Sequence, residues 1–244
     1  MAKTTYNIRE KLNTPSEEAY KILRSNIQFC SSDRKIRSIA ICSYGSGEGK
    51  TTVAINLSIS LARAGMKVLF VDADMRKPMI VKHLGSNNSS GLSNLLSGFA
   101  SFDDIICNTN IDNFNLIACG PKSPNPAELI ASERFGRFLE EAHNKYDMVI
   151  IDTPPLGGVI DCAVIAAQTD GVLMVIESKA VDYRCALSVK EQLDKANARI
   201  LGVVLNKVDR LYYKNYYSCY GYYRANRINK KWVRKNMQVE KVKV

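Results

Sequence analysis

Histidine is scarce in this sequence: only His83 and His143 occur among the 244 residues. A Ser-His-Asp hydrolase or a histidine-rich metal centre therefore has little to build on, because both need imidazole groups that converge on one site. The seven cysteines are odd in number and never form Cys-x-x-Cys, which favours reduced thiols in a cytoplasm and suggests no zinc site. No run of about 18 apolar residues and no signal-peptide core occurs, so we expect a soluble protein or one held at a membrane by something else.

Positive charge is plentiful but unevenly placed. The formal net charge is +10, yet residues 207–244 alone carry +9, because eleven Lys and Arg side chains face only Asp209 and Glu240. The first 206 residues carry +1. This distribution argues against a nucleic-acid-binding core and favours a tail that meets an anionic surface, with plain solvation of the tail as the alternative.

Short, nearly all-apolar segments alternate with amphipathic ones along most of the chain. We expect strands at 39–42, 67–72, 114–119, 148–151, 171–176 and 201–205. Strands that are apolar throughout and alternate with helices predict an α/β fold, doubly wound around a mainly parallel sheet, followed by a flexible C-terminal tail.

The remaining segments are less regular. Residues 1–15 read as a loose arm before a helix that Ser16 caps, and residues 79–113 read as short helices and turns. One continuous helix is expected over residues 127–146, after a proline-rich loop.

The segment SYGSGEGKTT follows the first expected strand and opens a helix, which is the arrangement of a phosphate-binding loop. Its three glycines let the backbone approach a phosphate, and N–H groups at a helix N-terminus favour an anion. Lys50 is expected to reach the β- and γ-phosphates, and the Thr51 hydroxyl to ligate Mg²⁺. The strict P-loop spacing requires Gly at position 44, where this chain has Tyr44, and a glycine-rich surface turn is the alternative. The expected nucleotide-binding residues are Gly45, Ser46, Gly47, Glu48, Gly49, Lys50, Thr51, Thr52 and, toward the adenine edge, Asn206.

Acidic residues follow two further strands. Asp72 and Asp74 come after the second strand, and Asp152 follows the strand at 148–151. Ligands of open parallel sheets bind at the carboxyl ends of the strands, so these carboxylates can converge with Lys50 on one Mg-nucleotide. A helix cap is the alternative role for any single one of them. We expect Lys50, Asp72, Asp74 and Asp152 to be catalytic, and Thr51, Asp74 and Asp152 to hold the metal.

Three segments together resemble the motifs of one family. SYGSGEGKTT, VLFVDADMRKP and MVIIDTPP resemble the Walker A, Walker A′ and Walker B motifs of the bacterial tyrosine kinases (BY-kinases) that regulate capsule and exopolysaccharide synthesis. The D-x-D-x-R-x-P form of the second motif is the most specific mark, because related partitioning and cell-division ATPases lack it. Those ATPases carry a signature lysine where this chain has Gly45. The resemblance covers roughly residues 14–223.

The resemblance implies an ATP-dependent protein-tyrosine autokinase that regulates capsular or exopolysaccharide polymerisation and export, with ATP and Mg²⁺ as cofactors. It implies autophosphorylation in a tyrosine cluster that supplies seven of twelve consecutive residues: Tyr212, Tyr213, Tyr216, Tyr217, Tyr220, Tyr222 and Tyr223. It also implies that Glu18, Lys21 and Arg24 lie on an oligomerisation helix, with Lys21 where the family has arginine. In domain terms we expect an arm and oligomerisation helix at 1–35, a P-loop kinase domain at 36–209 and the tyrosine cluster with a basic tail at 210–244.

The same resemblance implies the partners. These are a transmembrane polysaccharide co-polymerase or adaptor that supplies an activating cytosolic segment, a cognate tyrosine phosphatase, and other copies of the chain in a ring when unphosphorylated. The tail adds an anionic membrane surface as a partner, whereas nucleic acid is not expected. The protein is then cytoplasmic and recruited to the inner face of the plasma membrane by the adaptor. Two alternatives stay open: an ATPase switch of the partitioning type that phosphorylates no protein, and a catalytically dead scaffold.

Overall fold

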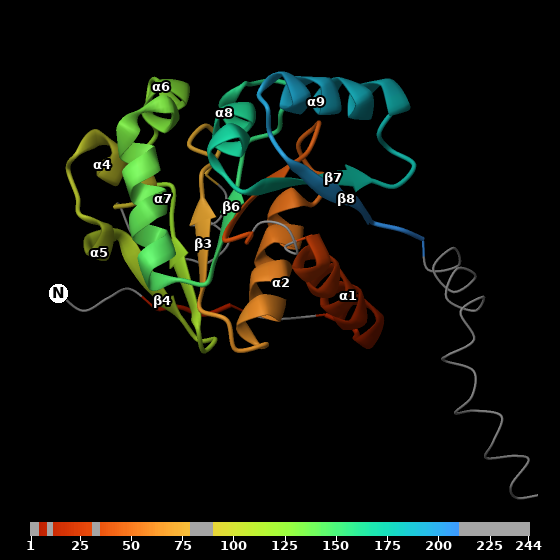
Figure 1. Cartoon of the computed structure of the whole chain (residues 1–244), viewed down its shortest axis with the longest axis horizontal. Helices are drawn as coiled ribbons and strands as arrows, with labels where there is room; N and C mark the ends of the chain where they lie inside the picture. Colours follow the sequence, from red (N-terminus) through yellow and green to blue (C-terminus); the bar gives the residue numbers. More distant parts are fainter. Residues whose placement is uncertain (1–4, 9–11, 31–34, 79–89, 210–244) are drawn as a thin grey trace, which may run out of the picture. The chain divides into compact units, whose positions relative to one another are not determined.

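The computed structural model describes residues 5–8, 12–30, 35–78 and 90–209 (Figure 1). Residues 1–206 form one compact unit, and a second unit begins at Lys207. The predicted tyrosine cluster from Tyr212 to Tyr223 and the basic tail after it lie outside the described residues.

The strands of the described residues form one eight-stranded sheet in the order β1-β4-β5-β3-β6-β2-β7-β8. Every neighbouring pair is parallel except β4 and β5, which are antiparallel. The predicted α/β class with a doubly wound, mainly parallel sheet is therefore confirmed. The strands are β1 (Thr5–Tyr6), β2 (Ser38–Cys42), β3 (Val68–Asp72), β4 (Ile106–Thr109), β5 (Phe114–Ile117), β6 (Met148–Asp152), β7 (Gly171–Glu177) and β8 (Ile200–Asn206).

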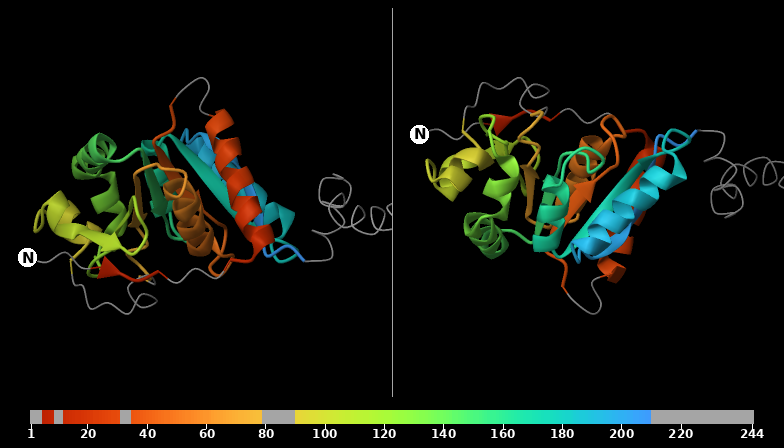
Figure 2. Two further views of the ribbon diagram at one scale, coloured as in Figure 1. Left: turned by 90° about the horizontal axis from the view of Figure 1, so that it is seen from below. Right: turned by 90° about the horizontal axis from the view of Figure 1, so that it is seen from above.

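Helices cover both faces of this sheet, as Figures 1 and 2 show. Apolar side chains of α1 and α2 pack on one face, and those of α4 to α9 pack on the other. All five residues of β2, β3 and β6 are buried, because these central strands have helices on both sides. The helices are α1 (Thr14–Cys30), α2 (Lys50–Ala62), α4 (Leu92–Ser97), α5 (Phe102–Ile105), α6 (Pro126–Ala131), α7 (Glu133–Lys145), α8 (Asp161–Gln168) and α9 (Tyr183–Lys195).

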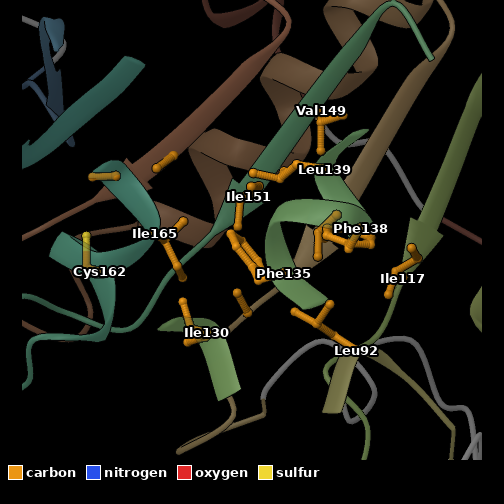
Figure 3. Close-up of a cluster of buried hydrophobic side chains, with 14 of the residues drawn as sticks. Leu92, Ile117, Ile130, Phe135, Phe138, Leu139, Val149, Ile151, Cys162 and Ile165 are labelled. Atoms are coloured by element: carbon orange, nitrogen blue, oxygen red, sulfur yellow. The ribbon is translucent and has the colours of Figure 1, made fainter. Parts of the chain in front are cut away.

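The core between α7 and the sheet is aromatic and aliphatic (Figure 3). The Phe135 and Phe138 rings lie 5.8 Å apart and are almost fully buried, beside Ile151 of β6 and Ile165 of α8. Each such side chain stabilises the fold by about 1.5–3 kcal/mol through the apolar area it removes from water. This packing makes β6 a rigid support for the residues that follow it.

The N-terminal segment departs from the expected loose arm. Thr5 and Tyr6 form β1 beside β4, and the Tyr6 and Ile8 side chains are buried. The Asn110 side chain accepts a hydrogen bond from the Ile8 N–H at 2.8 Å and donates one to the Ile8 carbonyl oxygen at 3.3 Å. The prediction was wrong for residues 5–8 because a two-residue strand is too short to show a period.

Two further elements differ from expectation. The helix expected over residues 127–146 is broken at Ser132, whose extended backbone (φ −73°, ψ 155°) separates α6 from α7. Its hydroxyl donates to the Leu129 carbonyl oxygen at 2.6 Å, which ends the first helix. Strand β4 lies where short helices and turns were expected. The prediction missed it because the strand has only four residues, and their burial does not alternate as in a typical half-exposed strand.

Within the described ranges, no helix has both the length and the apolar composition that crossing a membrane requires. A cavity of about 600 Å³ lies among residues such as Ile8, Arg63 and Asn113, which adjoin the amino ends of β3 and β5 and the ends of β1 and β4. It includes none of the predicted site residues. The chemistry therefore has to be sought at the carboxyl edge of the sheet.

Candidate active site at the carboxyl edge of the sheet

The loop between β2 and α2 has the backbone of a phosphate-binding loop. Gly47 and Gly49 have φ values of 88° and 90°, which a residue with a Cβ atom rarely adopts. A Cβ atom on Gly49 would also lie 2.1 Å from Nδ2 of Asn206. Tyr44 is not among the residues with positive φ, so the strict motif's first glycine is not required at this position.

Glu48 braces this loop with its side chain, a role that the sequence did not suggest. The carboxylate is buried and accepts hydrogen bonds from the N–H of Gly45, close by in the same loop, and from the N–H of Glu177 at 3.3 Å, at the end of β7. Its main-chain oxygen accepts a hydrogen bond from Nδ2 of Asn206 at 2.8 Å. Glu48 therefore ties the loop to the ends of both β7 and β8.

Lys50 and Thr51 converge on Asp152. The Lys50 ammonium lies 2.6 Å from Oδ1 of Asp152, and the Thr51 hydroxyl donates to Oδ2 at 2.5 Å. Only 9% of the Lys50 side chain and 2% of the Asp152 side chain are exposed. Parallel pairing of β2 with β6 sets this contact, because it brings the loop after one strand beside the end of the other.

Asp72 lies next to Asp152, its register partner in the pairing of β3 with β6. Its Oδ1 accepts a hydrogen bond from the Asp74 N–H at 3.1 Å, whereas its Oδ2 is buried and has no hydrogen-bond partner among the described residues. Burial, followed by the charge of Asp152, raises the pKa of Asp72 to about 8. An unpaired buried oxygen is costly, and it points to a missing group that would satisfy it.

The Asp152 carboxyl has a different balance of effects. Burial raises its pKa, while the Lys50 charge and the hydrogen bonds from Lys50 and Thr51 oppose that rise. Two carboxyls therefore stand side by side: Asp152 forms an ion pair with Lys50, whereas no ion pair of Asp72 is seen within the described residues. Such a difference in environment is typical of acid–base sites.

Asp74 follows on the loop after β3. Its Oδ1 accepts a hydrogen bond from the Lys77 N–H at 2.9 Å, which shapes the turn. Two residues further on, Arg76 forms a two-pronged ion pair with the buried Asp161, the first residue of α8. The sequence marked Arg76 only as part of a motif and did not mark Asp161 at all.

The donor set of this edge suits Mg²⁺. Thr51, Asp74 and Asp152 offer oxygen atoms alone, which is the ligand type that Mg²⁺ prefers. In the described part of the chain, no three His, Cys, Asp or Glu side chains cluster closely enough to hold a metal by themselves. Mg²⁺ commonly takes one or two carboxylates and completes its shell with waters and substrate phosphates, so the residues present fit an ion that arrives with a nucleotide.

The predicted oligomerisation residues lie on α1 but do not share one environment. Lys21 and Glu18 form an exposed ion pair at 2.7 Å. Arg24 instead donates from Nη1 to the Ser60 carbonyl oxygen at 2.7 Å and so ties α1 to α2 within the same chain.

Comparison with known proteins places the chain among related sequences. Residues 36–201 match the family described as AAA domain. Tyrosine-protein kinase CpsD of Streptococcus pneumoniae serotype 4 is 40% identical over 195 residues, which cover 80% of this chain and 85% of CpsD. Tyrosine-protein kinase YwqD of Bacillus subtilis is 37% identical over 210 residues, 85% of this chain and 86% of YwqD.

Solved structures agree with these relatives. The crystal structure of the chimerical protein CapA2B2 has a TM-score of 0.78 and 35% identity, covering 85% of this chain and 95% of that one. The septum site-determining protein MinD of Pyrococcus horikoshii, solved with Mg-ADP, is more distant, with a TM-score of 0.61, 28% identity and coverage of 71% of each chain. CpsD and YwqD match more of this chain, and at higher identity, than this MinD does.

Proposed function

Because this chain belongs to the bacterial tyrosine kinases of capsule and exopolysaccharide synthesis, and so is a tyrosine-protein kinase, we propose which of its residues carry the phosphoryl transfer. The observation that supports the assignment is the buried contact of Lys50 and Thr51 with Asp152, beside the unpartnered oxygen of Asp72. Phosphoryl transfer depends mainly on positioning and charge neutralisation, and this edge of the sheet supplies both.

The loop from Gly45 to Thr52 holds the phosphates of ATP. Gly47 and Gly49, which have positive φ, leave room for the backbone N–H groups to face an anion. Lys50 exchanges part of its contact with Asp152 for contacts with the β- and γ-phosphates. Thr51, Asp74 and Asp152 hold Mg²⁺, which neutralises phosphate charge when bound. Asn206 is fixed beside Gly49 by its bond to Glu48, and in this proposal it binds the edge of the adenine.

Asp72 accepts the proton of the attacking tyrosine hydroxyl. A carboxyl with a pKa of about 8 holds a proton at neutral pH, so Asp72 must lose it before it can act as a base. Lys50 lowers the pKa of Asp72, and any further positive charge at this edge acts in the same direction. Asp72 can then act as a base only when the nucleotide and Mg²⁺ are bound.

The substrate tyrosines are those from Tyr212 to Tyr223, presented by one copy of the chain to another within a ring. Glu18 and Lys21 on α1 contribute to the ring interface, and Arg24 contributes by fixing α1 on α2. Each phosphotyrosine adds about −1.5 to −2 charges, so phosphorylation cancels the basic charge of residues 207–244 and disperses the assembly.

A transmembrane polysaccharide co-polymerase or adaptor recruits the protein from the cytoplasm to the inner face of the plasma membrane, and a cognate phosphatase resets it. The basic tail adds attraction to anionic lipid, at up to about 1 kcal/mol for each basic residue near the surface. Sedimentation with anionic and neutral vesicles, before and after phosphatase treatment, tests this part. Equal binding in all samples would remove the lipid contact from the proposal.

The deciding experiment incubates the purified chain with Mg-ATP, with and without the adaptor's cytosolic segment, and blots for phosphotyrosine. The wild-type chain should label itself, whereas Lys50→Met should not. Retained labelling in Lys50→Met would contradict the assignment of the site. ATP hydrolysis without any phosphotyrosine would instead favour the nucleotide-switched ATPase.

A further inference from the structure

Arg76 belongs to the D-x-D-x-R-x-P motif but has no part in the site proposed above. Its Nε donates to Oδ2 of Asp161 at 2.7 Å, and its Nη2 donates to Oδ1 at 2.9 Å. Both carboxylate oxygens of Asp161 are therefore bound by one planar guanidinium, the geometry that arginine offers and lysine does not. The Asp161 side chain is 1% exposed, while that of Arg76 is 42% exposed.

The pair joins two loops that both start at the carboxyl edge. Arg76 lies on the loop after β3, two residues beyond Asp74, and Asp161 begins α8 at the end of the loop after β6 and Asp152. Among the described residues, the last main-chain hydrogen bond between these strands is donated by the Ala73 N–H to the Asp152 carbonyl oxygen at 2.8 Å. Asp74 lies beyond that point, and its hydrogen bonds to Asp72 and Lys77 are local.

Asp161 also balances a charge that could disturb the site. Asp74 and Arg76 are two residues apart and attract each other electrostatically. While Asp161 occupies the guanidinium, the Asp74 carboxylate keeps its hydrogen bond from the Lys77 N–H and is not drawn into an ion pair with Arg76. Among the described residues, Asp74 is the other carboxylate whose charge raises the pKa of Arg76.

We propose that Arg76 and Asp161 form a positioning pair that holds the loop of Asp74 against α8 and keeps the Asp74 carboxylate available to the magnesium site. This inference rests on the proposed function, because positioning Asp74 affects the chemistry only if Asp74 binds Mg²⁺. Arg76 is not catalytic here, since its fork is bound by Asp161.

The test measures binding of a fluorescent ATP analogue to the full chain, once with Mg²⁺ and once with EDTA. Arg76→Ala should bind the analogue about tenfold more weakly with Mg²⁺, the usual loss when a residue that orients a metal ligand is removed, and should match wild type with EDTA. Arg76→Lys should fall between the two, because a lysine keeps the charge but not the fork. Asp161→Asn should resemble Arg76→Ala, and the double variant Arg76→Ala with Asp161→Asn should lose less than the two single losses combined.

Arg137→Ala is the matched control. Arg137 pairs with Glu133 at 2.9 Å on α7, and both side chains are largely exposed, so its removal deletes an ion pair away from the site. This variant should bind the analogue as wild type does in both conditions. The proposal is overturned if Arg76→Ala and Arg76→Lys behave like Arg137→Ala, or if they lose affinity equally with Mg²⁺ and with EDTA, which would indicate a structural role alone.

Failure of the proposed function gives a different result. In that case the wild-type chain itself gains no affinity from Mg²⁺ and makes no phosphotyrosine, whatever the Arg76 variants do. If Asp161→Asn does not fold, Arg76→Lys and Arg76→Ala still decide the matter, because Arg76 lies at the partly exposed end of the pair.

Discussion

The carboxyl edge of the sheet and helix α1 carry the same kinds of side chain in opposite surroundings. At the sheet edge, Lys50 and Asp152 are in contact at 2.6 Å and nearly inaccessible to water. On α1, Glu18 and Lys21 are in contact at 2.7 Å, but 37% and 54% of their side chains are exposed. The two ion pairs thus have almost the same length but differ in their exposure to water.

Surroundings decide what each pair can do. Water and salt screen the exposed pair, so its geometry carries little free energy. The buried pair has lost its hydration, so removing either partner leaves a charge that nothing compensates. The ion pair of Arg76 with Asp161 is intermediate, because only one of its ends is buried.

The largest expected effect comes from breaking the buried pair. Asp152→Asn keeps the shape of the side chain but leaves the Lys50 ammonium buried without its counter-charge, which should cost about 3–5 kcal/mol in the free energy of unfolding. Autophosphorylation should fall below detection, because one metal ligand is lost as well. Urea denaturation and a phosphotyrosine blot measure the two effects.

The control for that variant is Asp103→Asn, which removes one carboxylate partner of Lys145, 3.0 Å away on the surface, and leaves Glu141 in place. Its denaturation midpoint and labelling should equal those of wild type. A wild-type midpoint in Asp152→Asn would show that the buried pair contributes nothing to stability.

The next effect is on the free energy of unfolding through Asp72, and it depends on pH. Its pKa is about 8 in the folded chain and lies near 3.8 when exposed, so the folded state holds this proton more tightly. Stability from this group is complete below pH 4 and is lost as the pH rises toward 8. Asp72→Asn should therefore stabilise the chain by several kcal/mol at pH 8 and have almost no effect at pH 4.

Denaturation curves at the two pH values check this prediction. Asp104 gives the opposite sign, because hydrogen bonds from the Ser101 hydroxyl and N–H lower its pKa. The contribution of Asp104 is present at neutral pH and fades in acid, so Asp104→Asn should destabilise the chain only above about pH 4. A pH-independent effect of Asp72→Asn would contradict the assigned environment.

A smaller effect is expected where α1 meets α2. Arg24→Ala removes the charged hydrogen bond to the Ser60 carbonyl oxygen and should lower the free energy of unfolding by about 1.5–3 kcal/mol, the usual range for such bonds. Thermal denaturation measures it. Arg24→Lys should recover part of the loss, and no recovery would argue that packing of the side chain matters more than its charge.

The smallest effect is expected from the exposed pair on α1. Lys21→Ala should leave the thermal midpoint of the isolated chain unchanged, because solvent screens the contact with Glu18. If the ring forms, the same variant should raise the protein concentration needed for assembly, and wild-type assembly should weaken as salt rises. Light scattering across salt concentrations distinguishes these outcomes, and a monomer under every condition would contradict the ring.

Much of the fold was predictable because its signals are local. The six expected strands all appear in the sheet, with ends shifted by at most two residues. Continuous apolar runs predict buried parallel strands, because no face of such a strand meets water. Strand β1 gave no comparable signal, because its two residues are held by pairing with β4, which is distant in sequence. The break at Ser132 gave none either, because it depends on the backbone conformation of that single residue.

The candidate site likewise has a part that the sequence predicts and a part that only the tertiary structure shows. The sequence by itself determined that Lys50, Thr51, Asp72 and Asp152 stand at strand ends, because motif spacing and apolar periodicity fix those positions. Only the tertiary structure decided that Oδ2 of Asp72 has no hydrogen-bond partner among the described residues while Asp152 is paired with Lys50, that the Glu48 carboxylate turns back onto its own loop, and that Arg76 meets Asp161. These properties follow from burial and from the packing of distant segments, such as the contact between Lys50 and Asp152, which are 102 positions apart and share no local pattern.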